Sequence, residues 1–220
     1  MLVRDRMSKG VVTIPSSTTI LEAEKIMKEK GIRRLPVVDH DRLAGIVTYN
    51  DLLEAEPSKA TTLSRFELTY LFSKMTVAEI MEKKVITIKP DTPIEEAALI
   101  MKRNKVGGLP VVEETRVMGI ITESDVFEVL VETLGVELGG TRITIELPEK
   151  PGELHQVTGI VSKYMINILS LATFYIDEKP DLRYVVIRIA TRNYEPIIKE
   201  LEAVGITVKH VWVTPVDEGA

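Results

Sequence analysis

The chain has 220 residues, and its 45% hydrophobic and 28% charged residues are ordinary for a globular protein with a core of normal size. A net charge of −5 and a pI near 5.4 argue against a nucleic-acid-binding surface, and the lack of cysteine excludes disulfides, thiolate metal sites and cysteine nucleophiles. The amino terminus lacks the apolar core of a signal peptide, and no run of about 18 apolar residues occurs. We therefore expect a cytoplasmic protein that binds neither nucleic acid nor membrane.

One stretch of the chain is written twice. Residues 7–53 align without a gap to residues 81–127 at a constant offset of 74, and about 21 of the 47 pairs are identical. The two copies end in nearly the same phrase, GIVTYND and GIITESD. A repeat of this length usually means two similar units that cover each other's apolar faces. The duplicated polar residues predict a pair of equivalent sites.

Each copy is predicted to fold as strand, helix, strand, strand and helix. In the first copy, strands are predicted at 11–14, 35–39 and 43–48. Ile20, Ala23 and Met27 fall at helical spacing and predict a helix that ends near Gly31. Asp51 opens the second helix, and the second copy repeats the same order.

A matching lead-in precedes each copy, and an apolar insertion separates the copies. The lead-in residues Val3, Asp5 and Met7 correspond to Val77, Glu79 and Met81. The insertion contains Leu63, Phe66, Leu68, Leu71 and Phe72, so we expect a helix that packs on the module or on a partner subunit. The predicted divisions are repeat 1 at 1–56, insertion at 57–75, repeat 2 at 76–132, linker at 133–140 and a carboxy-terminal domain at 141–214.

The carboxy-terminal domain has a βαββαβ pattern. Strands are predicted at 142–147, 167–176, 182–190 and 207–213, and helices at 153–164 and 194–203. This order is the ferredoxin-like plan, in which helices cover one face of a four-stranded antiparallel sheet and leave the other face for a partner. The fold class of the whole chain is therefore predicted to be α+β.

The T-x-x-D phrase occurs in both copies, as Thr48–Asp51 and Thr122–Asp125, where a strand gives way to a helix. One interpretation is a capping box, in which the threonine caps the helix and the acid reaches back. The alternative is a ligand site, because a helix amino terminus attracts phosphate and a carboxylate can accept hydrogen bonds from ribose hydroxyls. Duplication of the phrase favours the ligand site.

The lead-in V-x-D/E-x-M, the A-x-x-I-M helix, the LPVV strand and the G-I-x-T-x-x-D ending together resemble a tandem cystathionine-β-synthase (CBS) domain pair over residues 1–130. The resemblance implies a pseudo-twofold module with two clefts that adenine nucleotides commonly occupy. It implies that Asp51 and Asp125 bind ribose, and that Thr48 and Thr122 contact ribose or phosphate. The positions that it implies for the base pocket lie at or beside Thr13, Ile14, Thr87, Ile88, Pro36 and Pro110.

The two copies differ just before this proline. The first has Arg33 and Arg34, whereas the second has Gly107 and Gly108. Arginine forks suit phosphate, and paired glycines make room or let backbone approach a ligand. On general grounds, charged side chains beside a strand are more often solvated. Because the position borders the cleft in the family, we predict clefts of unequal affinity in which the arginines bind phosphate. The sequence leaves open which cleft they reach.

The carboxy-terminal domain resembles the ACT family over residues 141–213. The resemblance rests on the βαββαβ order and on the segments EKPGEL and INILSL. It implies an amino-acid site at a subunit interface, formed by Glu149, Gly152, Glu153, Leu154, Asn167 and Ile168. The alternative is that Pro151–Gly152 only forms a turn and the domain serves in dimerisation.

The order of CBS repeats, apolar insertion and ACT domain resembles the acetoin utilization B-type proteins of bacteria, although no residue indicates an acetoin site. An enzyme has little support, because His40, His155 and His210 are scattered and no P-loop or nucleophile elbow occurs. We predict a non-catalytic regulatory sensor with no metal and no required cofactor. Its regulatory ligand is an adenine nucleotide, S-adenosylmethionine or a dinucleotide, since all of these share adenosine.

The expected partners are a second copy of the chain, as a homodimer, and an unidentified target enzyme. Two alternatives stay open. One is an assembly or inhibitory module that holds a partner enzyme while its clefts are empty. The other is a weak nucleotide-handling enzyme, which product analysis after incubation with ATP would reveal.

Overall fold

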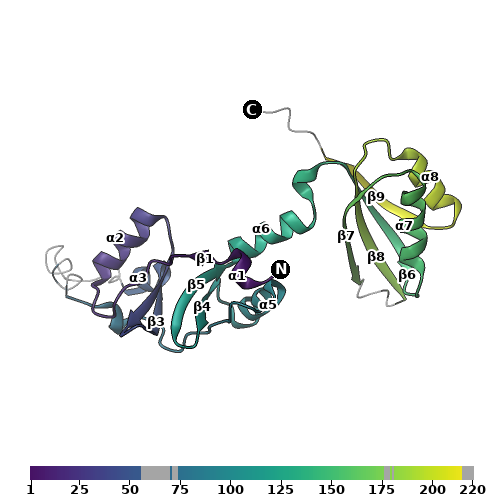
Figure 1. The fold of residues 1–220 in the computed structure, drawn as a ribbon. Helices are drawn as coiled ribbons and strands as arrows, with labels where there is room; N and C mark the ends of the chain where they lie inside the picture. Colours follow the sequence, from purple (N-terminus) through teal and green to yellow (C-terminus); the bar gives the residue numbers. More distant parts are fainter. Residues whose placement is uncertain (56–69, 71–73, 176–178, 180, 215–220) are drawn as a thin grey trace. The chain divides into compact units, whose positions relative to one another are not determined.

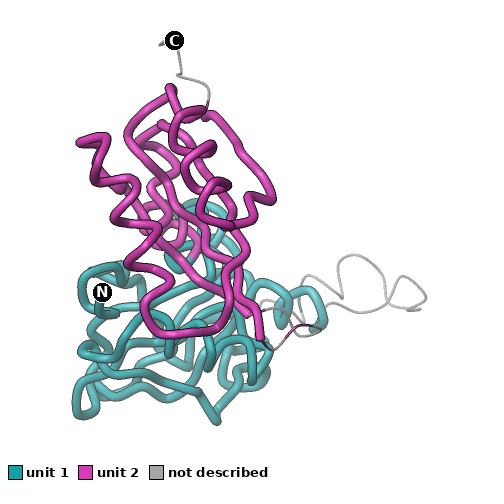
Figure 2. Tube along the Cα trace, turned by 90° about the vertical axis from the view of Figure 1, so that its right-hand side faces the viewer, with its two compact units in different colours: residues 1–126 teal, residues 127–220 magenta. Residues whose placement is uncertain are grey.

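The computed structural model describes residues 1–55, 70, 74–175, 179 and 181–214. The chain divides into two compact units, residues 1–126 and residues 127–220 (Figure 2), and each is described separately. The apolar residues of the insertion, on which a helix was predicted, lie outside the described residues. Unit 1 contains the first repeat and the second repeat up to the start of its last helix. Unit 2 contains the rest of that helix and the βαββαβ domain.

The first repeat consists of α2 (Ile20–Lys30), β2 (Arg34–Asp39), β3 (Arg42–Thr48) and α3 (Tyr49–Ala55). Thr19 caps α2, because its hydroxyl accepts a hydrogen bond from the Glu22 backbone N–H at 3.3 Å. Gly31 ends α2 with a φ of 64°, a left-handed conformation that suits glycine, so the predicted end of this helix is confirmed. The buried side chains of this repeat, among them Ala23, Met27 and Val47, form one apolar cluster.

The second repeat consists of α5 (Ile94–Asn104), β4 (Gly108–Glu113), β5 (Arg116–Thr122) and α6 (Glu123–Thr133). Its hairpin has the same register as the first, since Gly108 pairs with Thr122 just as Arg34 pairs with Thr48. Both hairpins carry an irregularity at the same place, between the two valines of the LPVV segment. The duplication of the sequence is therefore a duplication of structure.

The predicted first strand of each repeat is reduced to a single bridge. Ile14 pairs with Val37 in the parallel sense, and Ile88 pairs with Val111 in the same way. The Ile14 N–H donates to the Pro36 carbonyl at 3.2 Å, and the Ile14 carbonyl accepts from Val38 at 2.8 Å. The pairing goes no further in the first repeat because the next N–H on that side, that of Ser16, donates to the Asp39 carboxylate at 3.0 Å. In the second repeat Pro90 stands at the corresponding position and has no N–H to donate.

The lead-ins are exchanged between the repeats. In the first lead-in, α1 (Val3–Arg6) donates from Val3 to the Thr92 carbonyl at 2.9 Å, and β1 (Ser8–Lys9) pairs with β5 of the second repeat. The second lead-in contains the 3-10 helix η1 (Val77–Glu79), which donates from Val77 to the Thr18 carbonyl of the first repeat at 2.8 Å. Each repeat is thus completed by the segment that precedes the other copy.

Unit 2 begins with the end of α6 and with η2 (Val136–Leu138), and then has the predicted βαββαβ order. Its elements are β6 (Thr141–Pro148), α7 (Glu153–Lys163), β7 (Ile168–Tyr175), β8 (Leu182–Ile189), α8 (Glu195–Ala203) and β9 (Thr207–Val213). The four strands form one antiparallel sheet in the order β7-β8-β6-β9.

The helices α7 and α8 cover one face of this sheet (Figure 1). Their side chains Val157, Ile160 and Leu201 pack against alternate residues of β6 and β8, including Ile145 and Ile187, in a single apolar core. The ferredoxin-like prediction is confirmed, and neither α7 nor α8 lies on the opposite face of the sheet, where Ser170 and Arg188 bond to residues 134 and 139.

Candidate functional site

The T-x-x-D phrase forms a full capping box in the first repeat, where the Asp51 N–H donates to the Thr48 hydroxyl at 3.3 Å, and the acid half of one in the second. The Asp51 Oδ2 atom accepts hydrogen bonds from the Thr48 backbone N–H at 2.7 Å and from the Thr48 hydroxyl at 2.8 Å. In the second repeat, the Asp125 Oδ2 atom accepts the corresponding two bonds from Thr122, both at 2.7 Å. The capping interpretation is therefore observed, and it fixes each carboxylate at the amino terminus of a helix.

Two cavities of similar size lie in unit 1. The first cleft has a volume of about 630 Å³ and is lined by Ser8, Lys9, Gly10, Val11, Val12, Gly31, Ile32, Arg33, Arg34, Gly107, Ile120, Thr122, Glu123 and Ser124. The second cleft has a volume of about 690 Å³ and is lined by Arg33, Arg34, Ile46, Thr48, Tyr49, Asn50, Asp51, Leu53, Glu54, Lys105, Val106, Gly107 and Gly108. Each is large enough to hold a nucleotide-sized ligand.

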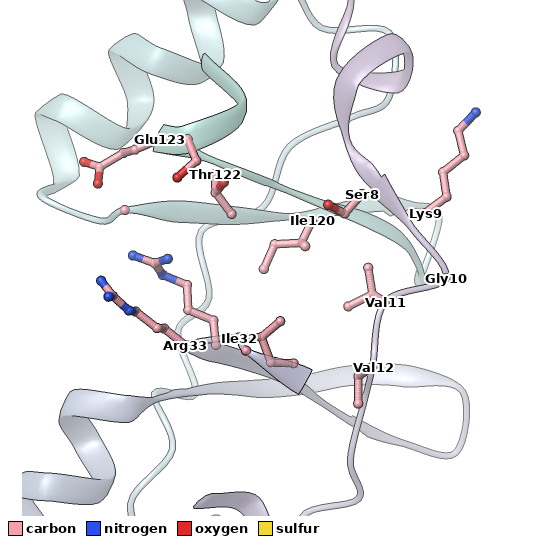
Figure 3. Close-up of a pocket in the computed structure, with 14 residues that line it drawn as sticks. Ser8, Lys9, Gly10, Val11, Val12, Ile32, Arg33, Ile120, Thr122 and Glu123 are labelled. Carbon is pink, nitrogen blue, oxygen red and sulfur yellow. The ribbon is translucent and has the colours of Figure 1, made fainter. Parts of the chain in front are cut away.

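Each cleft combines the T-x-x-D end of one repeat with the turn after the first long helix of the other. In the first cleft, Thr122 of the second repeat lies opposite residues 31–34 of the first. Figure 3 shows Ile32 and Arg33 facing Thr122 and Glu123 across this cleft. In the second cleft, Thr48 of the first repeat shares the cavity with residues 105–108 of the second. The sites are therefore composite, and neither repeat forms one alone.

Arg33, Arg34 and Gly107 line both clefts. A Cβ atom added at Gly107 would overlap the Nη2 atom of Arg34 and would stand 2.9 Å from an oxygen of Glu123. The glycine of the second repeat thus makes room for an arginine of the first, and the arginine pair is placed at the boundary of the two cavities. Arg33 and Arg34 therefore reach both clefts.

Some of the positions predicted for the base pocket point elsewhere. The Ile14 and Ile88 side chains are only 4% and 6% exposed and belong to the apolar core. Pro36 and Pro110 are buried within β2 and β4. Thr13, Thr87 and Asp125 are described residues that line neither cleft. A base pocket in either cleft would therefore be lined by residues next to these positions, and not by these side chains themselves.

Several polar residues of the clefts were not predicted from the sequence. Lys9 and Ser124 line the first cleft, and Tyr49, Asn50 and Lys105 line the second. The offset of 74 pairs Tyr49 with Glu123 and Asn50 with Ser124, so these positions differ between the copies although their neighbours are identical. In the sequence, this difference between the two copies, flanked by an identical Thr and Asp, indicates that the two sites are unequal.

The predicted ACT ligand residues fall into two groups. Glu149, Gly152, Glu153 and Leu154 line a cavity of about 280 Å³ at the loop between β6 and α7. There Glu149 forms an ion pair with Arg183, whose pKa is raised chiefly by that hydrogen bond. Asn167 and Ile168 lie at the far end of β8, because Ile168 pairs with Ile189 whereas Pro148 pairs with Leu182. Within one chain the groups do not meet, so the predicted site depends on a second chain.

The part of the chain that the structure describes contains no group of three or more His, Asp or Glu side chains placed to hold a metal ion. None of its helices has the length and apolar character needed to cross a membrane.

Comparison with known families identifies both units. The CBS domain model matches residues 3–58 and 77–132, and the TTHA0829-like ACT domain model matches residues 139–212. CBS and ACT domains are regulatory modules without catalytic activity. The two matched CBS segments are those that form the composite clefts.

Solved structures agree with this assignment. The CBS domain pair of protein MJ0100, in complex with 5′-methylthioadenosine and S-adenosyl-L-methionine, is 35% identical, with a TM-score of 0.50 over 59% of this chain and 95% of that one. A Vibrio cholerae protein named for acetoin utilization (AcuB) is 30% identical, with a TM-score of 0.52 over 62% of this chain and 96% of that one. CBSX2 in complex with AMP is 28% identical, with a TM-score of 0.50 over 59% and 96%.

The curated relatives include both short and long proteins. A CBS domain-containing protein of Dictyostelium discoideum is 37% identical over 136 residues, which are 61% of this chain and 94% of that protein. An L-aspartate semialdehyde sulfurtransferase of Methanocaldococcus jannaschii is 36% identical over 127 residues, but the chain spans only 22% of its length. The matches to the family models and to these relatives show that the chain belongs to the CBS-domain family and carries a tandem CBS pair followed by a TTHA0829-like ACT domain.

Proposed function

We propose that the CBS pair is a non-catalytic regulatory sensor, which binds an adenosine-containing ligand such as AMP, ATP or S-adenosylmethionine between its repeats. The observation that carries this proposal is the second cleft, where Asp51, Thr48 and both arginines surround one cavity of about 690 Å³. The adenosine compounds bound by the CBS pairs of MJ0100 and CBSX2 support the choice of ligand class. No resident cofactor or metal is required.

Capping and ligand binding use different oxygens of Asp51. Both hydrogen bonds from Thr48 go to Oδ2, and Oδ1 accepts none from the described residues. Oδ1 can therefore accept hydrogen bonds from vicinal ribose hydroxyls while Oδ2 remains held by the cap. The two interpretations of the T-x-x-D phrase are thus compatible, because the cap orients the carboxylate that the ligand meets.

The arginine pair supplies phosphate-binding charge to both clefts, and the residues around it differ between them. In the first cleft, a Glu123 oxygen lies near Gly107, where its negative charge opposes a phosphate. The corresponding residue in the second cleft is Tyr49, which is neutral, but Glu54 lines that cleft as well and Lys105 adds a positive charge to it. Asp51 also lines its cleft, whereas Asp125 does not. We infer that the second cleft binds the ligand more tightly.

Isothermal titration with AMP, ATP and S-adenosylmethionine tests this function. We expect saturable binding that is weakened strongly by Asp51→Ala and less by Asp125→Ala. Since Asp51→Ala also removes a helix cap, Glu22→Ala is the matched control: it removes the acid of the Thr19–Glu22 capping box, which lies outside both clefts. Undiminished binding in Asp51→Ala, or equal loss in Glu22→Ala, would contradict the proposal.

The rest of the proposed mechanism links the ligand to a partner. Binding that differs between two relative rotations of the repeats shifts the population of those rotations. We assign the ACT domain to dimerisation of this cytoplasmic protein, or to a second small ligand such as an amino acid at Glu149 and Asn167. The name of the Vibrio cholerae relative suggests a target enzyme in acetoin utilization. A monomeric mass in light scattering at micromolar concentration would contradict the homodimer.

A further inference from the structure

Two arginines face each other on the face of the ACT sheet opposite α7 and α8, where residues 134–139 also lie. Arg142 on β6 pairs directly with Arg188 on β8, so their side chains share one face. Arg188 is only 4% exposed. Like charges directly opposite on neighbouring strands are destabilising, and a buried charge without an opposite charge costs more. The sheet therefore places two positive charges side by side, and one of them is buried.

The hydrogen bonds of these arginines go to neutral groups. Arg188 donates from Nε to the Leu134 carbonyl at 3.1 Å, and from Nη1 to the Gly139 carbonyl at 3.0 Å and the Thr214 hydroxyl at 2.6 Å. Arg142 donates from Nη1 to the Thr144 hydroxyl at 2.8 Å. Within the described ranges neither arginine forms an ion pair, and the Nη2 groups of both have no acceptor. Burial and the neighbouring Arg142 lower the pKa of Arg188.

Arg142 and Arg188 both line a cavity of about 280 Å³. The Ser170 hydroxyl also lines it, but this hydroxyl donates to the Leu134 carbonyl at 2.9 Å. The remaining lining is apolar and includes Ala172, Phe174 and Val186. The cavity thus combines an apolar wall with two arginines that form no ion pair with any residue the structure describes. Its volume is less than half that of either CBS cleft.

We propose that this cavity binds a small carboxylic acid with an apolar body. The arginine forks match the two oxygens of a carboxylate, and the negative charge relieves the repulsion between Arg142 and Arg188. Phe174 and Val186 cover the hydrocarbon part, which a bare inorganic anion would leave unfilled. The site is separate from the predicted amino-acid site, whose loop residues line another cavity. It is independent of nucleotide binding by the CBS pair.

The fluorescence of Trp212 can report ligand binding at this site. Trp212 is the only tryptophan of the chain, it pairs directly with Arg142, and it is 55% exposed. We expect 3-methylbutanoate to change the fluorescence of Trp212 saturably in the full chain and to raise its melting temperature. The matched probe is 3-methylbutanamide, which has the same shape without the charge. We expect it to bind at least tenfold more weakly, since hydrogen bonds to charged groups are the stronger ones.

Three variants locate the site. We expect Arg142→Gln to weaken 3-methylbutanoate at least tenfold, and Ala172→Leu to abolish binding by filling the cavity while both arginines stay. Arg192→Gln is the control, because it removes the same charge from an exposed residue outside the cavity. Equal binding of acid and amide, no saturable response, or equal loss in Arg192→Gln would overturn the proposal. So would an Arg142→Gln chain that dissociates from dimer to monomer with unchanged affinity, since the cavity would then be a subunit interface.

Discussion

The guanidinium group of Arg34 occupies the space that a side chain at residue 107 would fill. A Cβ atom added at Gly107 would overlap the Arg34 Nη2 atom, and one added at Gly108 would stand 3.4 Å from the Arg34 Cδ atom. The main difference between the two copies is therefore complementary, because the glycines of one repeat accommodate an arginine of the other. This contact places one cationic pair against two cavities.

Gly107→Ala is predicted to displace the Arg34 guanidinium with little effect on stability. The overlapping atoms are the ends of flexible side chains, so the fold can adjust by moving them. We expect AMP to bind about tenfold more weakly, while adenosine, which has no phosphate, is affected little. Titration calorimetry of both ligands measures this difference.

The control for this change is Gly159→Ala in α7, where no heavy atom lies near the added Cβ. This variant should stabilise its helix by about 0.5–1 kcal/mol and leave AMP binding unchanged. In a double-mutant cycle, Gly107→Ala should weaken AMP less in an Arg34→Ala background, because the displaced group is already absent. Additive losses would show that Gly107 acts by another route.

The shared arginines predict competition between the clefts. A phosphate bound in the second cleft attracts Arg33 and Arg34, which also line the first. We expect AMP to bind with negative cooperativity or with one site per chain, and adenosine to bind the two clefts with less coupling. Titrations at low and high salt measure this coupling, which screening should reduce. Two independent AMP sites of equal affinity would contradict it.

Gly119→Ala is predicted to destabilise unit 1. The added Cβ would stand 2.6 Å from the Met7 Sδ atom and 2.9 Å from the Ser8 carbonyl oxygen. Because the second contact is backbone, the exchanged lead-in must shift, and we expect a loss of about 1–3 kcal/mol in the free energy of unfolding by denaturant. Met7→Ala combined with Gly119→Ala should recover only part of it. Full recovery would show that the side chain alone was in the way.

Asp39 is predicted to contribute pH-dependent stability. The Ser16 backbone N–H donates to its carboxylate at 3.0 Å and lowers its pKa in the folded protein. A lowered pKa means that the unfolded chain binds more protons, so this contribution is complete above the unfolded pKa of about 3.9 and is lost as pH falls through the folded pKa. We expect Asp39→Asn to flatten the decline of stability between about pH 5 and pH 2.

The second repeat supplies the control for this pH dependence. Glu113 corresponds to Asp39, but Pro90 stands where Ser16 does and has no N–H to donate. Glu113→Gln should therefore leave the acid limb of the stability curve closer to that of the parent chain. An identical flattening by both substitutions would show that the Ser16 hydrogen bond is not the cause.

The sequence predicted the elements of the ACT domain closely because their apolar alternation is regular. The strand predicted at 207–213 is β9, and the helix predicted at 194–203 is α8 with its start one residue later. The capping boxes were equally accessible, since Thr48 and Asp51 are three residues apart and interact locally. Local spacing is sufficient for features of this kind.

The composite nature of the clefts was less accessible from sequence. That Arg34 lies against Gly107, and that residues 1–9 complete the second repeat, depends on how the repeats pack. Ile14 was assigned to the neighbourhood of the base pocket by family resemblance, but its bridge to Val37 directs its side chain into the core. The Arg142–Arg188 pair could be recognised only from the register of β6 and β8.

A crystal structure of the full chain grown with AMP would show where the nucleotide binds. We expect AMP in the second cleft, with ribose hydroxyls within hydrogen-bond distance of the Asp51 Oδ1 atom and the phosphate at Arg33 or Arg34. We also expect the Thr48 bonds to Oδ2 to be retained. Two empty clefts at saturating AMP, or AMP bound elsewhere, would rule out the proposed sensor and favour an assembly module that holds a partner enzyme.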